Sequence, residues 1–229
     1  MRASRKISAM VCTAAAAAVL ALTPTSAHAV QVVACSENAL VNAINAANTI
    51  GGDDLILSPF CTYTITTAHG SSGNGPSALP VITTPITMSG LGTDIVRASG
   101  AADFRILEVN GSASYPGTYG ELSLNAVTLR GGKAAEGGVG GAIANLGGTV
   151  TLNSSTLRNN TAQAGGGLYN DSGTSSLVGS TVVGNTATAS NGGGGIYENS
   201  GQVTLVGSLV RANSPQNCMP VASVPFCNG

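Results

Sequence analysis

An internal repeat in the second half of the chain constrains the fold more than any other feature. Four segments share one alternation of apolar and polar residues, and their central leucines are spaced by 28, 25 and 28 residues: Leu124, Leu152, Leu177 and Leu205. Repeats of this length are typical of stacked architectures, in which each repeat packs only against its neighbours. We therefore expect residues 122–213 to form successive, similar coils of the chain.

The residue types within each repeat favour strands over helices. β-Branched residues, Gly and Asn fill each period, and these are poor helix formers. A Gly-rich motif recurs nine residues before each of the last three central leucines, at Ile143, Leu168 and Ile196. Short alternating strands with turns between them predict an all-β fold, a right-handed parallel β-helix with coils about 4.8 Å apart. The central leucines, Val150 and Leu157 should point inward, and Ser154–Ser155 should bend the chain from one sheet to the next.

Three asparagines occupy one position of the repeat, eight residues after a central leucine: Asn160, Asn185 and Asn213. Amide side chains stacked on parallel strands can hydrogen-bond to one another and to the turn backbone. We expect an asparagine ladder here, with a structural role.

The N-terminal segment is typical of a secretory signal peptide. A basic stretch at Arg2–Lys6 precedes a short apolar run at Ala14–Leu22, and Ala27–Ala29 provides a small-x-small cleavage site. The apolar run is too short to span a bilayer. We therefore expect residues 1–29 to be removed, no membrane span, and a secreted, extracellular chain. Residues 30–229 should form a single β-helix domain.

A capping helix is expected over about residues 36–49. Ser36 can cap its N-terminus, and Gly51–Gly52 can end it. One face of this helix is apolar, with Leu40, Ala43, Ile44 and Ala47. A stack of strands needs its open end covered, because exposed strand edges recruit other strands.

Four cysteines remain after the signal peptide: Cys35, Cys61, Cys218 and Cys227. An even number in an exported chain favours disulfides. Of the three pairings, Cys35–Cys61 with Cys218–Cys227 is the simplest, and it places a disulfide at each end, the second closing a loop over residues 218–227. Zinc is disfavoured, because there is no CxxC motif and His69 is the only histidine after residue 29.

Between the cap helix and the repeats, the sequence predicts further strands and one loop. Strands are expected at Leu55–Leu57, Tyr63–Thr67, Val81–Met88, Ile95–Val96 and Phe104–Val109, and a glycine-serine loop is expected at His69–Ser77.

Several motifs resemble those of secreted bacterial right-handed β-helix proteins of the pectate-lyase-like superfamily. They are Phe104-Arg-Ile-Leu107, the Gly-Gly motifs ending at Ile143, Leu168-Tyr169 and Ile196-Tyr197, and Asn-Thr-Ala at Asn160 and Asn185. The Gly-Gly-Ala-Ile motif also resembles the repeats of polymorphic outer-membrane proteins. The resemblance implies a parallel β-helix fold, and it leaves the activity open because this fold serves many functions.

Two sets of outward residues are candidates for ligand binding. Tyr169 and Tyr197 share a position in successive repeats and could present an aromatic surface to a sugar ring. Arg130, Arg158 and Arg211 share another position, interrupted by Val183, and could bind an acidic polysaccharide. The alternative for the tyrosines is packing under a glycine loop, and for the arginines a solvated sheet face.

The carboxylates favour a protein without catalytic residues. Asp171 and Glu198, with neighbouring amides, make at best a poor calcium site, because calcium takes six to eight oxygen ligands. No pair of carboxylates aligns as in a glycosidase, and a Ser-His-Asp triad would need His69. We therefore predict no cofactor, with calcium the only alternative, and no catalytic residue.

Two functions remain at this stage. The first is a non-catalytic secreted β-helix that is structural, adhesive or glycan-binding, and the scarcity of carboxylates favours it. The second is a calcium-assisted polysaccharide lyase or another carbohydrate-active enzyme. Without residues 1–29 the chain has six basic and ten acidic residues, a net charge near −4, which disfavours nucleic acid as a partner. We expect a monomer whose partner is an extracellular or cell-wall polysaccharide.

Overall fold

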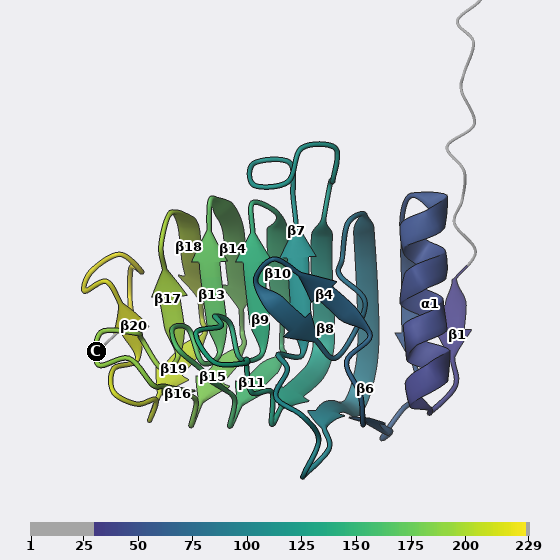
Figure 1. Cartoon of the computed structure of the whole chain (residues 1–229), viewed down its shortest axis with the longest axis horizontal. Coiled ribbons are helices and arrows are strands. Elements are labelled where there is room, and N and C mark those ends of the chain that lie inside the picture. Colours follow the sequence, from purple (N-terminus) through teal and green to yellow (C-terminus); the bar gives the residue numbers. More distant parts are fainter. Residues whose placement is uncertain (1–29, 228–229) are drawn as a thin grey trace, which may run out of the picture.

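The computed structural model describes residues 30–227, so the expected signal peptide lies outside the described residues. This part of the chain is predominantly β-structure, with long parallel sheets and one helix (Figure 1). The strands follow one another along the long axis of the molecule in sequence order, from the purple N-terminal end to the yellow C-terminal end. Within residues 30–227, no helix combines the length and apolar character needed to cross a bilayer.

The elements have the following bounds: β1 Gln31–Val33, α1 Glu37–Ile50, β2 Asp53–Leu57, β3 Thr62–Ile65, β4 Gly70–Ser72, β5 Gly75–Ser77, β6 Pro85–Arg97, β7 Leu107–Asn110, β8 Glu121–Arg130, β9 Ile143–Leu146, β10 Thr149–Asn153, β11 Thr156–Arg158, β12 Thr161–Ala162, β13 Leu168–Asp171, β14 Gly173–Val178, β15 Thr181–Val183, β16 Thr186–Ala187, β17 Ile196–Glu198, β18 Gly201–Val206, β19 Leu209–Arg211 and β20 Cys218–Met219.

The first and largest sheet has 11 strands, and its main path runs β1-β2-β6-β8-β10-β14-β18 with every pair parallel. The central leucines of the repeats lie directly opposite one another in this sheet, and all four are buried: Leu124, Leu152, Leu177 and Leu205. The predicted inward column is therefore confirmed. Alternation along each strand places every second residue in the core.

A second parallel sheet of five strands, in the order β20-β17-β13-β9-β7, takes one strand from each successive passage of the chain. Ile143, Leu168 and Ile196 are aligned in it and are completely buried. The short strands β11, β15 and β19 pair in parallel and belong to the first sheet, in which β11 also pairs with β8, whereas β12 and β16 form a separate parallel pair. The inward residues of these sheets pack together as one hydrophobic core.

Stacked polar side chains form hydrogen bonds with the backbone groups of the turns between the sheets. The amide nitrogen of Asn160 donates to Asn185 at 2.9 Å, and that of Asn185 donates to Asn213 at 3.0 Å, which confirms the predicted ladder. The predicted bend also forms, since Ser154 adopts a left-handed conformation with φ of 49°. A second amide pair, Asn145 with Asn170 at 2.8 Å, was not expected.

A column of glycines brings the backbones of successive sequence repeats together. A Cβ atom on Gly141 would lie 2.4 Å from the carbonyl oxygen of Gly166, and one on Gly166 would lie 2.6 Å from that of Gly194. The loop just before each of these glycines varies in length: three residues separate Ala162 from Gly166, and six separate Ala187 from Gly194. The difference in repeat length is confined to these loops.

Helix α1 forms where the sequence predicts it. The side chain of Ser36 accepts a hydrogen bond from the amide of Ala39, and Gly51 ends the helix in a left-handed conformation. Its buried residues contact the first strands of the large sheet: Leu40, Val41, Ala43, Ile44 and Ala47. Both predicted disulfides, Cys35–Cys61 and Cys218–Cys227, are present.

Two segments differ from the sequence-based expectation. Residues 69–77 are not a simple loop, because β4 and β5 pair as an antiparallel hairpin that lies in front of the sheets in Figure 1. The expected strands at Val81–Met88 and Ile95–Val96 belong largely to one strand, β6, with an irregularity in pairing between Ser89 and Thr93. The hairpin is stabilised by partners distant in sequence, and repeat analysis cannot reveal such contacts.

Candidate functional site

The outward face of the second sheet carries an acidic residue and two tyrosines that are candidates for a functional site. One column of this face contains Glu108, Ala144, Tyr169, Tyr197 and Met219, which are aligned on neighbouring strands. Glu108 and Ala144 are completely buried, whereas the two tyrosines are half-buried. The column therefore has a covered part on β7 and β9 and an accessible part on β13 and β17.

The two tyrosine rings of the accessible part are stacked, with ring centroids 5.6 Å apart and planes inclined by only 6°. They line a cleft of about 330 Å³, and Asn199 lines it as well. The other lining residues come from the variable loops before the glycine column: Val139, Gln163, Ala164, Ala189, Asn191 and Gly192. The sequence predicted the shared column but not the cleft. The cleft-forming loops lie where the repeat pattern is interrupted.

The polar groups of this tyrosine cleft are neutral amides and phenols. Burial raises the pKa of Tyr169, and the nearby negative charge of Asp171 and the Tyr197 ring add to that shift. The hydroxyl of Tyr169 is therefore protonated at neutral pH and can both donate and accept a hydrogen bond. Such a lining matches neutral hydroxyl groups better than a charged ligand, because no charged side chain of the described residues lines the cleft.

The two carboxylates considered for calcium do not converge. Glu198 is aligned with the inward Asn170, whereas Asp171 is the next residue along β13, and neighbouring strand residues point to opposite faces. Asp171 accepts hydrogen bonds from Asn199 at 3.0 Å and Ser200 at 2.7 Å. Burial by itself would raise the pKa of Asp171, but these bonds and one from Ser172 hold it below its ordinary value.

Glu198 has a different environment. Burial raises its pKa, only partly offset by a hydrogen bond from the backbone of Val203, and its Oε2 atom is buried without a hydrogen-bond partner among the described residues. In residues 30–227 there is no group of three or more His, Cys, Asp or Glu side chains that could hold a metal ion.

The arginine column lies on strands β8, β11 and β19 of the first sheet. Arg130, Arg158 and Arg211 are aligned with Val183 between the last two, as the sequence predicts. Asp94 of β6 partly neutralises them, because its Oδ2 atom accepts from Arg130 at 2.7 Å and lies 3.4 Å from Arg158. The sequence analysis missed Asp94 because it did not align β6 with the repeats.

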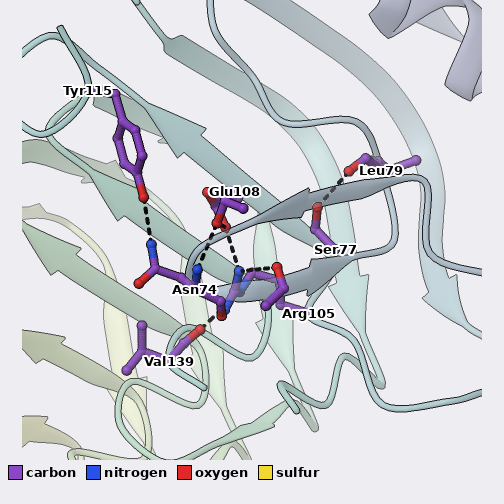
Figure 2. Close-up of polar contacts among 9 residues, drawn as sticks. Asn74, Ser77, Leu79, Arg105, Glu108, Tyr115 and Val139 are labelled. Carbon is purple, nitrogen blue, oxygen red and sulfur yellow. Dashed lines mark hydrogen bonds and ion pairs between the residues drawn. The ribbon is translucent and has the colours of Figure 1, made fainter. Parts of the chain in front are cut away.

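A buried ion pair under the hairpin was also missed (Figure 2). Arg105 and Glu108 are fully buried, and the Arg105 guanidinium donates to Glu108 Oε2 at 2.5 Å. The guanidinium also donates to backbone carbonyls of the hairpin and of the loop before β9: Asn74, Gly75 and Val139. Burial lowers the pKa of Arg105, and the charge of Glu108 opposes this shift.

Side-chain hydrogen bonds attach the hairpin to the rest of the structure at Glu108 and Tyr115, in addition to the bonds from Arg105. Ser72 donates to Glu108 Oε2 at 2.9 Å, and Asn74 donates to the Tyr115 hydroxyl at 2.7 Å (Figure 2). The Oε1 atom of Glu108 is buried and has no partner within the described part of the chain. The detectable signal in the sequence was a pair of opposite charges inside the apolar segment 104–109.

The arrangement around His69 does not form a catalytic triad. Its Nε2 atom lies 2.7 Å from Glu37 Oε1 and 3.3 Å from the Thr67 hydroxyl. A triad needs the hydroxyl and the carboxylate on opposite ring nitrogens, so that the histidine can take a proton from one while the other orients it. Here both use the same nitrogen, which indicates a structural link between the hairpin base and α1.

Known proteins add no assignment: no family model, curated protein or solved structure matches the chain.

Proposed function

We propose that the protein is an exported, non-catalytic right-handed parallel β-helix that binds a neutral glycan in the tyrosine cleft. The observation that carries this proposal is that two stacked tyrosines and three amide-bearing residues, Gln163, Asn191 and Asn199, line one cleft. Sugar rings offer C–H surfaces to aromatic groups and hydroxyls to amides and phenols. The signal-peptide pattern and the two disulfides support an extracellular location.

The neutral lining favours hexose polymers over uronates. A uronate carboxylate in the cleft would approach the charge of Asp171, whose hydrogen bonds favour its ionised form. The arginine column is less suited to recognition, because Asp94 already accepts from two of its three members. Membership of the pectate-lyase-like superfamily is proposed here for the ancestry of the chain and not for its activity, since the described residues offer no converging carboxylates for calcium.

Binding of neutral and uronic oligosaccharides to the purified protein tests this proposal. Isothermal titration calorimetry should detect a neutral ligand first found on a glycan array, and Tyr169→Ala should weaken it at least tenfold, about 1.4 kcal/mol. Tyr119→Ala is the matched control, because Tyr119 is a 71% exposed tyrosine that does not line this cleft. The affinity of the Tyr119→Ala variant for the same ligand should equal that of the unmodified protein.

Calcium should have no effect on this binding, and addition of EDTA should leave the titration unchanged. Equal affinity of Tyr169→Ala and the unmodified protein would contradict the cleft as the binding site. Steady release of unsaturated products from polygalacturonate, abolished in Asp171→Ala, would instead establish the lyase alternative.

A further inference from the structure

Both ends of the first sheet are unprotected strand edges. β1 and β18 are the terminal strands of its main path, and within residues 30–227 each pairs with only one neighbouring strand along that path. An edge of this kind can pair with another chain, and natural proteins usually prevent this with charged residues on the edge. Neither Gln31–Val33 nor Gly201–Val206 contains a charged residue.

One outward column of side chains runs through all seven strands of the main path and is apolar only at its two ends. Its members, from β1 to β18, are Val32, Ile56, Ser89, Asn125, Asn153, Val178 and Val206. Val32 is 74% exposed and Val206 is 53% exposed. The middle of the column is polar, with Asn153 donating to Asn125 and Asn125 to Ser89.

We propose that β18 of one copy pairs in parallel with β1 of a second copy, so that the first sheet continues from molecule to molecule. If the register of the sheet is kept, Val206 lies opposite Val32 of the second copy. Val178, Val206, Val32 and Ile56 then form one uninterrupted apolar run across the junction. Burial of these side chains stabilises the junction in addition to the strand hydrogen bonds.

The geometry favours this head-to-tail contact over a symmetric one. The two edges belong to the same sheet, run in the same direction and share one column, so a parallel junction repeats the pairing already present inside the molecule. Pairing of β18 with β18 would be antiparallel, and in full overlap it would place Val206 opposite Gly201. A head-to-tail contact that does not close into a ring gives an open chain of molecules.

The caps at the two ends leave these edges accessible. β1 is the outermost strand at its end in Figure 1, beyond α1. At the other end, Val224 of the C-terminal loop is only 2% exposed and belongs to the core. Within this loop β20 pairs with β17 of the second sheet, and the amides of Ser223 and Cys227 donate to Pro220 and Val224, so among these bonds none reaches β18. The proposal departs from the monomer expected from the sequence.

Analytical ultracentrifugation of the disulfide-bonded protein from an exporting host tests the proposal. The sedimentation coefficient should rise with concentration, because the junction is small and its association weak. Val206→Lys and Val32→Lys should each abolish this rise, since each places a charge at one edge. Thr149→Lys, which adds the same charge to the interior strand β10, is the control and should leave the rise unchanged. Thermal unfolding verifies that each variant is folded.

Mixing the two edge variants distinguishes the proposal from a symmetric contact. Val206→Lys retains an intact β1 edge and Val32→Lys retains an intact β18 edge, so their mixture should form dimers and nothing larger. Self-association of Val32→Lys alone would overturn the proposal in favour of a β18–β18 contact. A constant sedimentation coefficient for the unmodified protein at all concentrations would overturn it altogether. Neither result bears on glycan binding, because the tyrosine cleft is on the other sheet.

Discussion

Arg105 shows how one residue can organise three segments of the chain. Its guanidinium binds the side chain of Glu108, the hairpin carbonyls and the carbonyl of Val139. A buried charge pair adds little net stability relative to apolar residues, because desolvation opposes the attraction. Its loss is costly nonetheless, since removal of one partner leaves the other charge buried and unpaired. We therefore interpret Arg105 as the residue that determines the position of the hairpin.

Replacement of Arg105 should reveal this dependence. Arg105→Met should lower the free energy of unfolding by about 3–5 kcal/mol, because Glu108 remains buried without its partner. The double variant Arg105→Met/Glu108→Met should recover most of that loss. Urea denaturation followed by circular dichroism measures both. Arg211→Met, at an exposed arginine, is the control and should match the unmodified protein. A double variant as unstable as the single one would refute the interpretation.

Single residues were predictable from the sequence where the repeat places them in columns. The central leucines, the ladder at Asn160, and the shared position of Tyr169 and Tyr197 follow from the spacing alone. Arg105 and Asp94 were not predictable in this way. Apart from Glu108, the partners of Arg105 lie 30 or more residues away, as do both arginine partners of Asp94, and one of those partner segments is a hairpin outside the repeat.

At the scale of elements, α1 and the hairpin are linked through one carboxylate. Glu37 lies in the first turn of α1 and accepts from the Thr66 amide, the Thr66 hydroxyl, the Thr67 amide and His69. Burial by itself would raise the pKa of Glu37, but the bonds from His69, Thr66 and Thr67 outweigh it, and the pKa lies below its ordinary value. The helix was predictable from its cap and apolar face, whereas this link was not.

The lowered pKa of Glu37 predicts how the link depends on pH. A carboxyl group whose pKa is lower in the folded state contributes stability above its unfolded-state pKa, about 4.3, and loses it as the pH falls through the folded-state value. Glu37→Gln should therefore be less stable than the unmodified protein at neutral pH, and the difference should shrink on acidification below about pH 4.

Urea denaturation at a series of pH values measures this difference. Glu121→Gln, at an exposed carboxylate of β8, is the control and should show no comparable difference at neutral pH. A Glu37→Gln difference that grows on acidification would have the wrong sign for this account.

At the scale of the whole molecule, one disulfide lies near each end of the described chain and the parallel sheets form the middle. Cys35–Cys61 connects α1 to the strand region and closes a separation of 26 residues, and Cys218–Cys227 closes one of 9. The repeat made the middle of the fold predictable, because each pair of neighbouring parallel strands places equivalent repeat positions opposite each other. The tyrosine cleft was less predictable, since its rim consists of loops that follow no period.

Removal of each disulfide should therefore have unequal effects. Closing the longer separation restricts the unfolded chain more, so Cys35→Ser/Cys61→Ser should cost about 1 kcal/mol more than Cys218→Ser/Cys227→Ser. Both double variants should keep the strand signal in circular dichroism, because the leucine columns do not depend on either disulfide. Equal losses, or a larger loss for the C-terminal pair, would contradict the chain-entropy account.

The glycine column also has an evolutionary consequence. A side chain at these glycines would collide with neighbouring backbone, and the spacing from each glycine to the next central leucine is constant, yet the preceding loop contains three residues in one repeat and six in the next. Those loops supply Gln163 and Asn191 to the rim of the cleft. Under the proposed function, insertions, deletions or grafts in these loops should alter glycan preference while the parallel strands keep their register, so glycan preference should be able to diversify independently of folding.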